Sequence, residues 1–414
     1  MGHWFALRFM QEGHDVDIFY DGKKNNNNIR VLEGLVPEPF TEQPDFGRYD
    51  LVLFEMTGRP KLAEAASLET LVLGDSEIAS IIEDDRLSGI TVMENCGINI
   101  PPYETFNDLG EAKAFVKKNK KAYAFKPSGS DQETAATYVA KSPEDLLKYL
   151  DKLSELSKHE EFILQEVVKG TEVSTEGWFN GKEFFLINST LEEKKFMNDN
   201  HGPNTGCAGN LVFLHDILNP PLVFREGLQK MTEFLQQYDY RGMIDLNTIV
   251  SETQLYGLEW TPRIGYDATA TLFHTISSDI TDLLGDIASG GRPVYQVKHK
   301  YAASVRLSIP PYPSEIDNKH PEDVPIQGLE DEKNIYRTHF LYDARLNEKE
   351  ELVTAGVSGF IGTPIAGSDT IYEAFYKCND RLERIQVPDL QFRTDIRDSV
   401  VKRFNALSTQ GWLR

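Results

Sequence analysis

Cysteine is rare in this sequence, and its placement excludes two common uses of the residue. The 414 residues include three cysteines, Cys96, Cys207 and Cys378. Their number is odd, they lie far apart, and no Cys-x-x-Cys spacing occurs, so neither a zinc site nor a disulfide framework is indicated. Unpaired thiols are typical of a reducing compartment, and we therefore expect a cytoplasmic protein.

Basic residues are also few relative to acidic ones. The sequence has 43 Lys and Arg residues against 65 Asp and Glu residues, which gives a formal net charge of −22. Such a charge repels nucleic acid and anionic membrane surfaces over most of the molecule. We expect neither as a partner, and any phosphate-bearing ligand must meet a local basic pocket.

Long apolar runs are missing as well. No uninterrupted run approaches the ~18 apolar residues that span a bilayer, and the N-terminus lacks the basic and apolar regions of a signal peptide. The sequence therefore predicts a protein that neither spans a membrane nor is exported by that route. With 40% hydrophobic residues it can still bury a sizeable core, and its length favours about two to three domains.

The stretch from Leu191 to Gly209, LEEKKFMNDNHGPNTGCAG, is the most informative part of the chain. Pro203 fixes one backbone dihedral, and the glycines around it free others. Such a loop can turn backbone N–H groups toward an anion while Lys194 and Lys195 supply positive charge. We interpret the stretch as an ordered ligand loop with its turn at Gly-Pro-Asn-Thr-Gly, and the alternative is a polar surface turn.

The N-terminal part of the chain has the pattern of a small parallel α/β unit. A helix is predicted over residues 3–12 and a strand over 15–20. Short apolar strands at 49–54 and 70–73 flank a helical pattern at 60–66, which supports a parallel sheet. A domain of this type normally begins with a hydrophobic strand and a glycine turn, so its first strand is expected to be missing here. Residues 25–28 are predicted to form an exposed loop.

The next part is predicted to present a lysine beside a glycine-containing loop. Helices are expected over residues 76–96 and 109–118, followed by a strand at 122–127. The alternation of that strand would point Lys126 inward, just before Pro-Ser-Gly-Ser. The alternative is a solvated lysine at a sheet edge.

Acidic side chains recur in the strands that follow. Asn180-Gly181 predicts a hairpin between strands at 172–180 and 182–189. After a helix at 221–238, two strands at 241–250 and 255–260 carry Asp245, Asn247 and Glu259 at near-alternate positions. Unpaired acids are costly to bury, so Asp245 and Glu259 predict a hard-cation site that suits magnesium. Further along we expect a helix at 268–289, strands between 301 and 340, a surface turn at 310–313 and a helix at 368–385.

Several of these motifs resemble the phosphoribosylamine–glycine ligase (glycinamide ribonucleotide synthetase) family of the ATP-grasp superfamily. Residues 202–209 (GPNTGCAG), residues 259–267 (EWTPRIGYD) and residues 393–396 (RTDI) are similar to family motifs. The resemblance implies a mixed α/β and α+β protein. It has an N-terminal Rossmann-like domain at 1–75, an ATP-grasp domain at 76–295 with a lid at about 108–170, and a small α+β domain at 296–414.

The resemblance also implies roles for individual residues. Those expected to bind the nucleotide are Lys126, Ser128, Gly129, Ser130, Glu166, Val168, Glu172 and Arg86, with residues 161–168 resembling an edge strand that binds adenine. Those expected to hold the metal are Asp245, Glu259, Asn247 and Thr261. Catalytic roles are implied for Lys194, Arg263 and Asn204, and substrate contacts for Pro203, Thr205, Gly206, Asn200 and Asp267.

The sequence departs from the family pattern where substrates and metal are recognised. His3, Trp4 and Phe5 stand where the family has Arg, Glu and His, and Thr261 replaces a metal-binding Asn. Glu192-Glu193 stand in place of Asp-His, and Asn200 stands in place of an Asp. Gln132-Glu133 lie within the phosphate loop, where the family has other residues.

The implied activity is an ATP-dependent ligation with magnesium or manganese as cofactor. A carboxylate, glycine in the family, would attack ATP to give an acyl phosphate, which 5-phosphoribosylamine would capture as an amide in purine synthesis. The expected partners are therefore small molecules, and the chain is expected to be a monomer or homodimer. Two alternatives are a ligase for another acid and amine, and a nucleotide-binding homologue with weak or no turnover.

Overall fold

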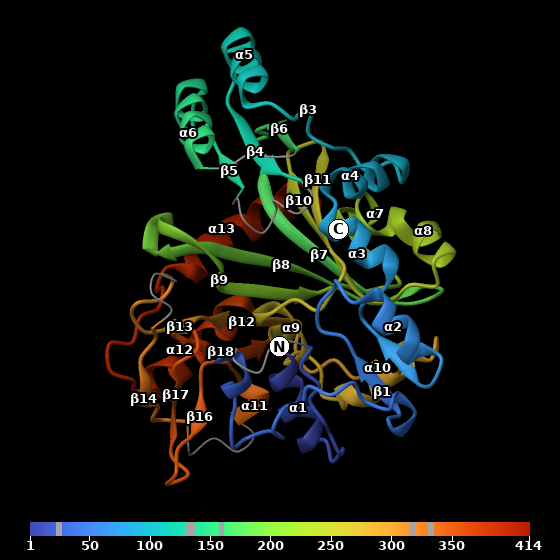
Figure 1. The fold of residues 1–414 in the computed structure, drawn as a ribbon, viewed down its shortest axis with the longest axis vertical. Coiled ribbons are helices and arrows are strands. Elements are labelled where there is room, and N and C mark those ends of the chain that lie inside the picture. Colours follow the sequence, from blue (N-terminus) through green and yellow to red (C-terminus); the bar gives the residue numbers. More distant parts are fainter. Residues whose placement is uncertain (22–26, 129–136, 157–160, 315–318, 330–334) are drawn as a thin grey trace.

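The computed structural model describes residues 1–21, 27–128, 137–156, 161–314, 319–329 and 335–414. A large antiparallel sheet runs through the middle of the molecule in Figure 1, with a smaller sheet above it. The N-terminus lies below the sheet, whereas the C-terminus lies level with it. In the described part of the chain the large sheet has nine strands, in the order β11-β10-β7-β8-β9-β12-β18-β13, with β15 paired to β18. Its strands are β7 (Thr171–Asn180), β8 (Phe184–Met197), β9 (His201–Leu214), β10 (Arg241–Val250), β11 (Leu255–Thr261), β12 (Tyr301–Val305), β13 (Leu307–Ser308), β15 (His339–Leu341) and β18 (Phe360–Ser368).

The turn between β7 and β8 forms where the sequence predicts it. Gly181 has a φ of 89°, a conformation that glycine adopts without strain. The side-chain oxygen of Asn180 accepts hydrogen bonds from the backbone N–H groups of Lys182 and Glu183 at 3.1 and 3.0 Å. The Asn-Gly pair therefore closes this hairpin through its own local chemistry.

The turn between β8 and β9 lies elsewhere than the sequence predicts. The Gly-Pro-Asn-Thr-Gly segment belongs to β9, and the chain reverses at a 3-10 helix over Asn198–Asn200. Asp199 and Asn200 adopt positive φ values of 55° and 56°, which short Asp and Asn side chains tolerate. The C-terminal segment holds this turn, because the N–H of Asp199 donates to Asp395 at 2.8 Å. The predicted loop is therefore a long β-hairpin with irregular pairing near its tip.

The smaller sheet forms a lobe at the top of Figure 1. Its described strands are antiparallel and lie in the order β3-β6-β4-β5, so β6 is an interior strand and the prediction of an edge strand was wrong. The lobe has its own apolar core, in which Phe125 and Phe162 are fully buried with their ring centroids 4.9 Å apart. Its elements are β3 (Tyr103–Phe106), α5 (Leu109–Asn119), β4 (Tyr123–Pro127), β5 (Tyr138–Val139), α6 (Pro143–Leu156) and β6 (Phe162–Glu166).

The N-terminal segment contains the predicted parallel pair of strands. β1 (Leu51–Leu53) pairs in parallel with β2 (Leu71–Leu73), and α2 (Pro60–Ser67) connects them. The first helix, α1 (Gly2–Gln11), also forms as predicted. Residues 15–20 do not form a strand, because their pairing is limited to an isolated bridge between Phe19 and Phe40. Residues 25 and 26 of the predicted exposed loop at 25–28 lie outside the described residues, and Asn27–Arg30 forms a 3-10 helix.

Three predicted long helices are each broken in the structure. Residues 76–96 form α3 (Glu77–Asp84) and α4 (Arg86–Asn95), because the Asp85 side chain accepts from the N–H groups of Leu87 and Ser88 and starts a new helix. Gly227, at φ −112° and ψ −104°, interrupts the helix predicted at 221–238. The pieces of the other two are α7 (Leu222–Arg225), a 3-10 helix (Leu228–Met231), α8 (Thr232–Gln237), α9 (Asp267–Phe273) and α10 (Ile280–Ala288).

The C-terminal segment continues the large sheet. β12 pairs with β9 and β18, so the sheet runs across the boundary expected at residues 295 and 296. The expected domain limits therefore stay a proposal. The remaining described elements are β14 (Glu322–Pro325), α11 (Ile335–Thr338), β16 (Arg345–Leu346), β17 (Leu352–Ala355), α12 (Ile371–Arg384) and α13 (Ile396–Thr409). No described helix is both long and apolar enough to cross a membrane.

Candidate active site

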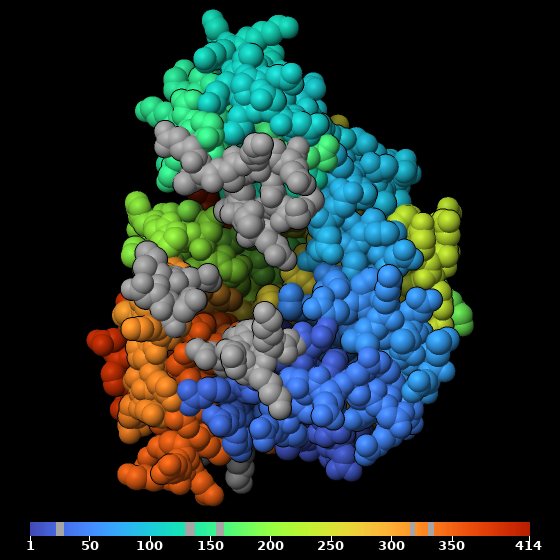
Figure 2. Space-filling model, viewed as in Figure 1, coloured from blue at the N-terminus to red at the C-terminus, as the bar shows by residue number. Residues whose placement is uncertain are grey.

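One face of the large sheet carries a band of polar side chains. Strand residues alternate between faces, and the register places Glu176 of β7 between Asp245 of β10 and Asn188 of β8. Figure 2 shows a hollow on this side of the molecule, between the lobe of α5 and α6, the large sheet, and the segment of α2 to α4. The band consists of Glu172, Ser174, Glu176, Asn188, Thr190, Glu192, Lys194, Asp245, Asn247, Glu259 and Thr261.

The upper lobe and α4 contribute positive charge at the β11 side of this band. Lys126 of β4 is 6% exposed, and burial lowers its pKa to about 8, against the opposing effect of Glu259. Arg86, at the start of α4, donates from Nε to the carbonyl of Pro127 at 2.8 Å and lies 3.7 Å from Glu259 through Nη1. The structure therefore brings the predicted residues Lys126, Arg86 and Glu259 together.

Lys194 and Glu172 form an ion pair across β7 and β8. Nζ of Lys194 lies 2.6 Å from Glu172 Oε1, and Asn247 Nδ2 donates to the same oxygen at 3.3 Å. Burial disfavours the charge on Lys194, but Glu172 and Glu192 outweigh this effect and raise its pKa. Three predicted site residues therefore share one cluster.

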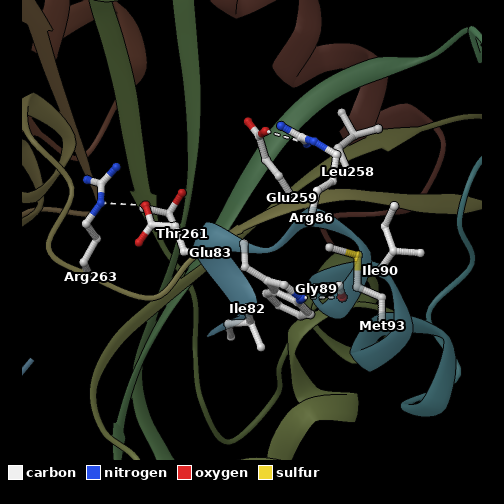
Figure 3. A pocket seen from close by; sticks show the side chains of 11 residues that line it. Ile82, Glu83, Arg86, Gly89, Ile90, Met93, Leu258, Glu259, Thr261 and Arg263 are labelled. Atoms are coloured by element: carbon white, nitrogen blue, oxygen red, sulfur yellow. Dashed lines mark hydrogen bonds and ion pairs between the residues drawn. The ribbon is translucent and has the colours of Figure 1, made fainter. Parts of the chain in front are cut away.

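Arg263 lies beside a cavity between α3, α4 and β11 (Figure 3). Its Nε donates to Glu83 Oε1 at 2.7 Å, and Glu83 accepts a second hydrogen bond from Thr57 at 2.8 Å. The cavity has a volume of about 190 Å³, and Figure 3 shows the Arg263–Glu83 and Arg86–Glu259 pairs with apolar side chains of α3 and α4 below them. The other residues that line it are Ile82, Gly89, Ile90, Met93, Leu258, Trp260 and Thr261.

The predicted metal residues leave buried oxygens without partners. Asp245 pairs in register with Thr261, and Asn247 with Glu259, so the four side chains lie side by side. Asp245 Oδ1 and Asn247 Oδ1 have no hydrogen-bond partner among the described residues. Burial raises the pKa of Asp245 well above its usual range, and the charges of Glu176 and Glu192 raise it further. Buried oxygens of this kind suit a hard cation.

The described residues contain no group of three or more His, Cys, Asp or Glu side chains that could hold a metal ion. Magnesium commonly takes one or two protein carboxylates and completes its shell with water and phosphate oxygens. The donor set of Asp245, Asn247 and Glu259 fits a magnesium ion that arrives with a phosphate ligand.

The predicted adenine segment is partly engaged. The N–H of Glu166 donates to the Pro102 carbonyl at 2.8 Å, and its carboxylate pairs with Lys121 at 2.6 Å. Val168 is half-buried just beyond β6. Ser128 is buried, and its hydroxyl has no partner in the described chain. The predicted residues Gly129 and Ser130 lie outside the described residues.

The predicted substrate residues lie along the β8–β9 hairpin. Thr205 donates from Oγ1 to the Lys194 carbonyl at 3.0 Å, which ties the Gly-Pro-Asn-Thr-Gly strand to the Lys194 cluster. Pro203 and Asn204 are exposed. Asn200 is at the turn, where its side-chain oxygen accepts from Arg393 Nη1 at 3.1 Å. Asn200 therefore helps to hold the turn.

Asp267 makes a different contact from the one expected. Its side chain has no exposed surface, and it accepts hydrogen bonds from Arg306 Nε at 3.1 Å and from Nη2 at 2.8 and 3.0 Å. A buried carboxylate engaged in this way does not fit direct contact with a substrate. Asp267 instead positions Arg306.

Sequence reasoning missed several polar residues of the band. Glu176 is 2% exposed and accepts from Asn188 Nδ2 at 2.9 Å and from Thr190. Burial raises the pKa of Glu192 to about 7. The signal was present, since Glu172, Ser174 and Glu176, and likewise Asn188, Thr190, Glu192 and Lys194, stand at every second position. No comparable pattern points to Arg306.

Residues 89–267 match the family model described as phosphoribosylglycinamide synthetase, ATP-grasp (A) domain. A phosphoribosylamine–glycine ligase of Methanosarcina acetivorans is 24% identical over 338 residues, which cover 78% of this chain and 74% of that protein. The same enzyme of Halalkalibacterium halodurans is 23% identical over 82% of this chain and 79% of its own. The chain is a relative of the phosphoribosylamine–glycine ligases. The predicted resemblance to this family is confirmed.

Solved structures of similar fold support the same conclusion for this chain. The phosphoribosylamine–glycine ligase of Thermotoga maritima gives a TM-score of 0.71 at 18% identity, over 95% of this chain and 96% of that one. A biotin carboxylase domain of Hydrogenobacter thermophilus 2-oxoglutarate carboxylase, solved with MgADP, gives 0.64 at 13% identity, over 100% and 96%. The predicted ATP-grasp fold is confirmed, and the whole polar band lies within residues 89–267.

Proposed function

We propose that this chain is an ATP-dependent ligase that joins a carboxylate to an amine, with glycine and 5-phosphoribosylamine as its substrates. Its curated relatives bear the name phosphoribosylamine–glycine ligase. The observation that carries the proposal is the meeting of Lys126, Arg86 and Glu259 with the unpartnered oxygens of Asp245 and Asn247 inside an ATP-grasp domain.

The nucleotide would lie between the two sheets. Lys126 supplies positive charge from the upper lobe and Arg86 supplies it from α4, and burial strengthens the interaction of both with phosphate oxygens. The Glu166 carbonyl and the Val168 N–H are the hinge groups that remain for adenine, since the Glu166 N–H is already bonded. Glu172 would accept from the ribose hydroxyls, and Ser128, Gly129 and Ser130 would cover the phosphates.

Asp245, Asn247 and Glu259, with Thr261 beside them, would hold magnesium or manganese. When bound, such an ion offsets the charge of the phosphates. Without it, Asp245 is a buried acid among acids, which is why its pKa is raised. The proposed metal site therefore contains carboxylates whose charged form is unfavourable in the free protein.

The other site residues position the reactants and exclude water. Lys194 and Arg263 each carry a charge that can turn from its present carboxylate, Glu172 or Glu83, toward a developing negative charge. Asn204 and its neighbours in β9 would line the substrate side. Orientation and charge neutralisation account for most of the catalysis in phosphoryl transfer.

Release of ADP tests the proposal. We expect turnover when purified protein receives MgATP, glycine and 5-phosphoribosylamine together, and none when any one is left out. Lys126→Ala should abolish turnover, whereas the control Lys113→Ala, which removes an α5 lysine paired with Asp151 at 2.7 Å, should not. If no pair of acid and amine from a broad panel supports turnover, the ligase proposal is contradicted.

A ligase for a different amine is the second candidate, and the N-terminal helix favours it. Trp4 and Phe5 are 3% and 1% exposed, so they form core rather than a substrate surface. The Glu55 carboxylate accepts a hydrogen bond from the N–H of Gly2 at the first turn of α1, where it would repel a phosphorylated amine. ADP release with an unphosphorylated amine, and none with 5-phosphoribosylamine, would select this candidate.

A cytoplasmic location and a monomeric or homodimeric state complete the proposal. Cys96, Cys207 and Cys378 are all free thiols, as is usual in a reducing compartment. Light scattering of the purified protein at several concentrations measures the oligomeric state directly.

A further inference from the structure

Arg306 follows β12 at the end of the polar band opposite to Lys126, and it is held on three sides. Asp267 binds its Nε and Nη2 atoms, and its Nη1 donates to the hydroxyl of Tyr312 at 2.7 Å. The Phe360 ring lies under the guanidinium, with Cζ 4.1 Å from the ring centroid. The plane of the group is therefore fixed before any ligand arrives.

The fourth side of the guanidinium faces Gly206. A Cβ atom at Gly206 would lie 3.9 Å from both Nη1 and Nη2, and no other non-neighbouring heavy atom of the described residues would lie within 4 Å of it. Gly206 is exposed, so this space opens to solvent. A guanidinium has five N–H donors, and the oxygens of Asp267 and Tyr312 engage only part of them. Donors of Nη1 and Nη2 remain for a ligand beside Gly206.

The charges nearby favour a singly charged, planar ligand. Asp267 neutralises Arg306, and Glu192 lies close enough to interact electrostatically with Asp267. A doubly charged phosphate would be repelled by these acids, whereas the two oxygens of a carboxylate match two parallel N–H donors of one guanidinium.

We propose that Arg306, positioned by Asp267 and Tyr312, binds the carboxylate of the acid substrate in the space beside Gly206. This inference rests on the proposed ligase function, because that function requires a carboxylate substrate on this face of the sheet. It adds a specificity-determining residue outside the motifs that resemble the family. Gly206 has a matching role, since any side chain there would occupy the carboxylate position.

Binding of acids and of their uncharged amides tests the inference. Glycine and glycinamide, β-alanine and β-alaninamide, and acetate and acetamide are titrated into the protein by calorimetry, with and without magnesium and a non-hydrolysable ATP analogue. We expect wild type to bind at least one acid tenfold or more tightly than its amide. Arg306→Met should remove that preference, a loss of about tenfold to a hundredfold for a charged hydrogen bond, with the Kd of the analogue unchanged.

A second variant keeps the buried ion pair intact. Gly206→Ala places a methyl group at ordinary contact distance from Arg306, so it should fold normally and weaken the acid without weakening the amide. Gly285→Ala is the matched control, because a Cβ there meets no atom of the described part of the chain within 4 Å. If Arg306→Met fails to fold, Gly206→Ala decides the question alone.

Each remaining outcome counts against a stated idea. Equal binding of acids and amides by wild type, or a preference that survives Arg306→Met and Gly206→Ala, overturns the inference. Arg306-dependent binding of inorganic phosphate that is tighter than that of every acid also overturns it. If the ATP analogue does not bind, the proposed function fails, while the titrations without nucleotide still measure the carboxylate preference.

Discussion

The two ends of the polar band hold their cations in different ways. At the β11 end, the partner carboxylates are open to solvent, with side-chain exposures of 43% for Glu172 and 46% for Glu259. At the β12 end, Arg306 is 10% exposed and its partner Asp267 is completely buried. The same chemical pairing therefore occurs in two environments along one face of the molecule.

This difference indicates two roles for ion pairs in one site. Exposed pairs contribute about 0–1 kcal/mol, so Lys194, which is 36% exposed, can exchange its carboxylate for a ligand at little cost. A buried pair is costly to break, since the remaining charge is left without a partner or water. The β11 end is suited to ligands that come and go, and the β12 end provides a fixed guanidinium.

The largest expected effect is at the buried pair. Asp267→Ala leaves the Arg306 charge buried beside Phe360 and should lower the free energy of unfolding by about 3–5 kcal/mol. Chemical denaturation measures this change. The double variant Asp267→Ala with Arg306→Met should recover much of the loss, because it removes both charges. A single variant as stable as wild type would show that the two ends of the band do not differ.

The next effect concerns nucleotide binding at the β11 end. Lys126→Ala removes a buried charge from the phosphate side and should weaken a non-hydrolysable ATP analogue about tenfold to a hundredfold. Calorimetry with Lys113→Ala as control measures it. Equal affinity in both variants would place the phosphates away from Lys126.

The pH dependence of that affinity sharpens the same point. Burial lowers the pKa of Lys126 to about 8 in the free protein, and a bound anion favours the protonated lysine. Binding above pH 8 therefore takes up a proton, so affinity should fall by roughly tenfold per pH unit beyond the pKa and level off below pH 7. Arg263→Lys should keep this profile, whereas Lys126→Arg should flatten it. A flat wild-type profile between pH 7 and pH 9.5 would contradict this reading of Lys126.

The smallest effect is expected at the exposed pair. Glu172→Gln removes the Lys194 ion pair, and its effect on the free energy of unfolding should stay below about 1 kcal/mol. Urea denaturation measures the change, with Glu166→Gln, which breaks the similarly exposed Lys121 pair, as the matched control. A loss as large as that of Asp267→Ala would remove the contrast between the two ends.

Sequence reasoning succeeded where a local rule decides the structure. The Asn180-Gly181 turn and the strands at 122–127, 241–250 and 255–260 follow from turn chemistry and alternation. Lys126 lies on the smaller sheet, and Asp245 and Glu259 lie on the large sheet. Their placement toward one site follows from the same alternation together with the family resemblance. The roles of these residues stay predictions.

Sequence reasoning failed where distant contacts decide the structure. The predicted turn at Gly-Pro-Asn-Thr-Gly is a strand, because Asp395 and Arg393 hold the reversal at Asp199 and Asn200. The long helix predicted at 76–96 breaks at Asp85, whose side chain starts a second helix that brings Arg86 to Glu259. Helical periodicity alone does not reveal such a break.

By itself, the sequence determined the alternating polar strands, the Asn-Gly hairpin and the excess of acid that confines phosphate binding to a local pocket, since each depends on neighbours within a few positions. Only the tertiary structure decided that Asp267 binds Arg306, 39 residues away in the chain, and that Gly206 leaves room beside the guanidinium. Such pairings depend on how strands from separate segments align, and no local pattern encodes that alignment.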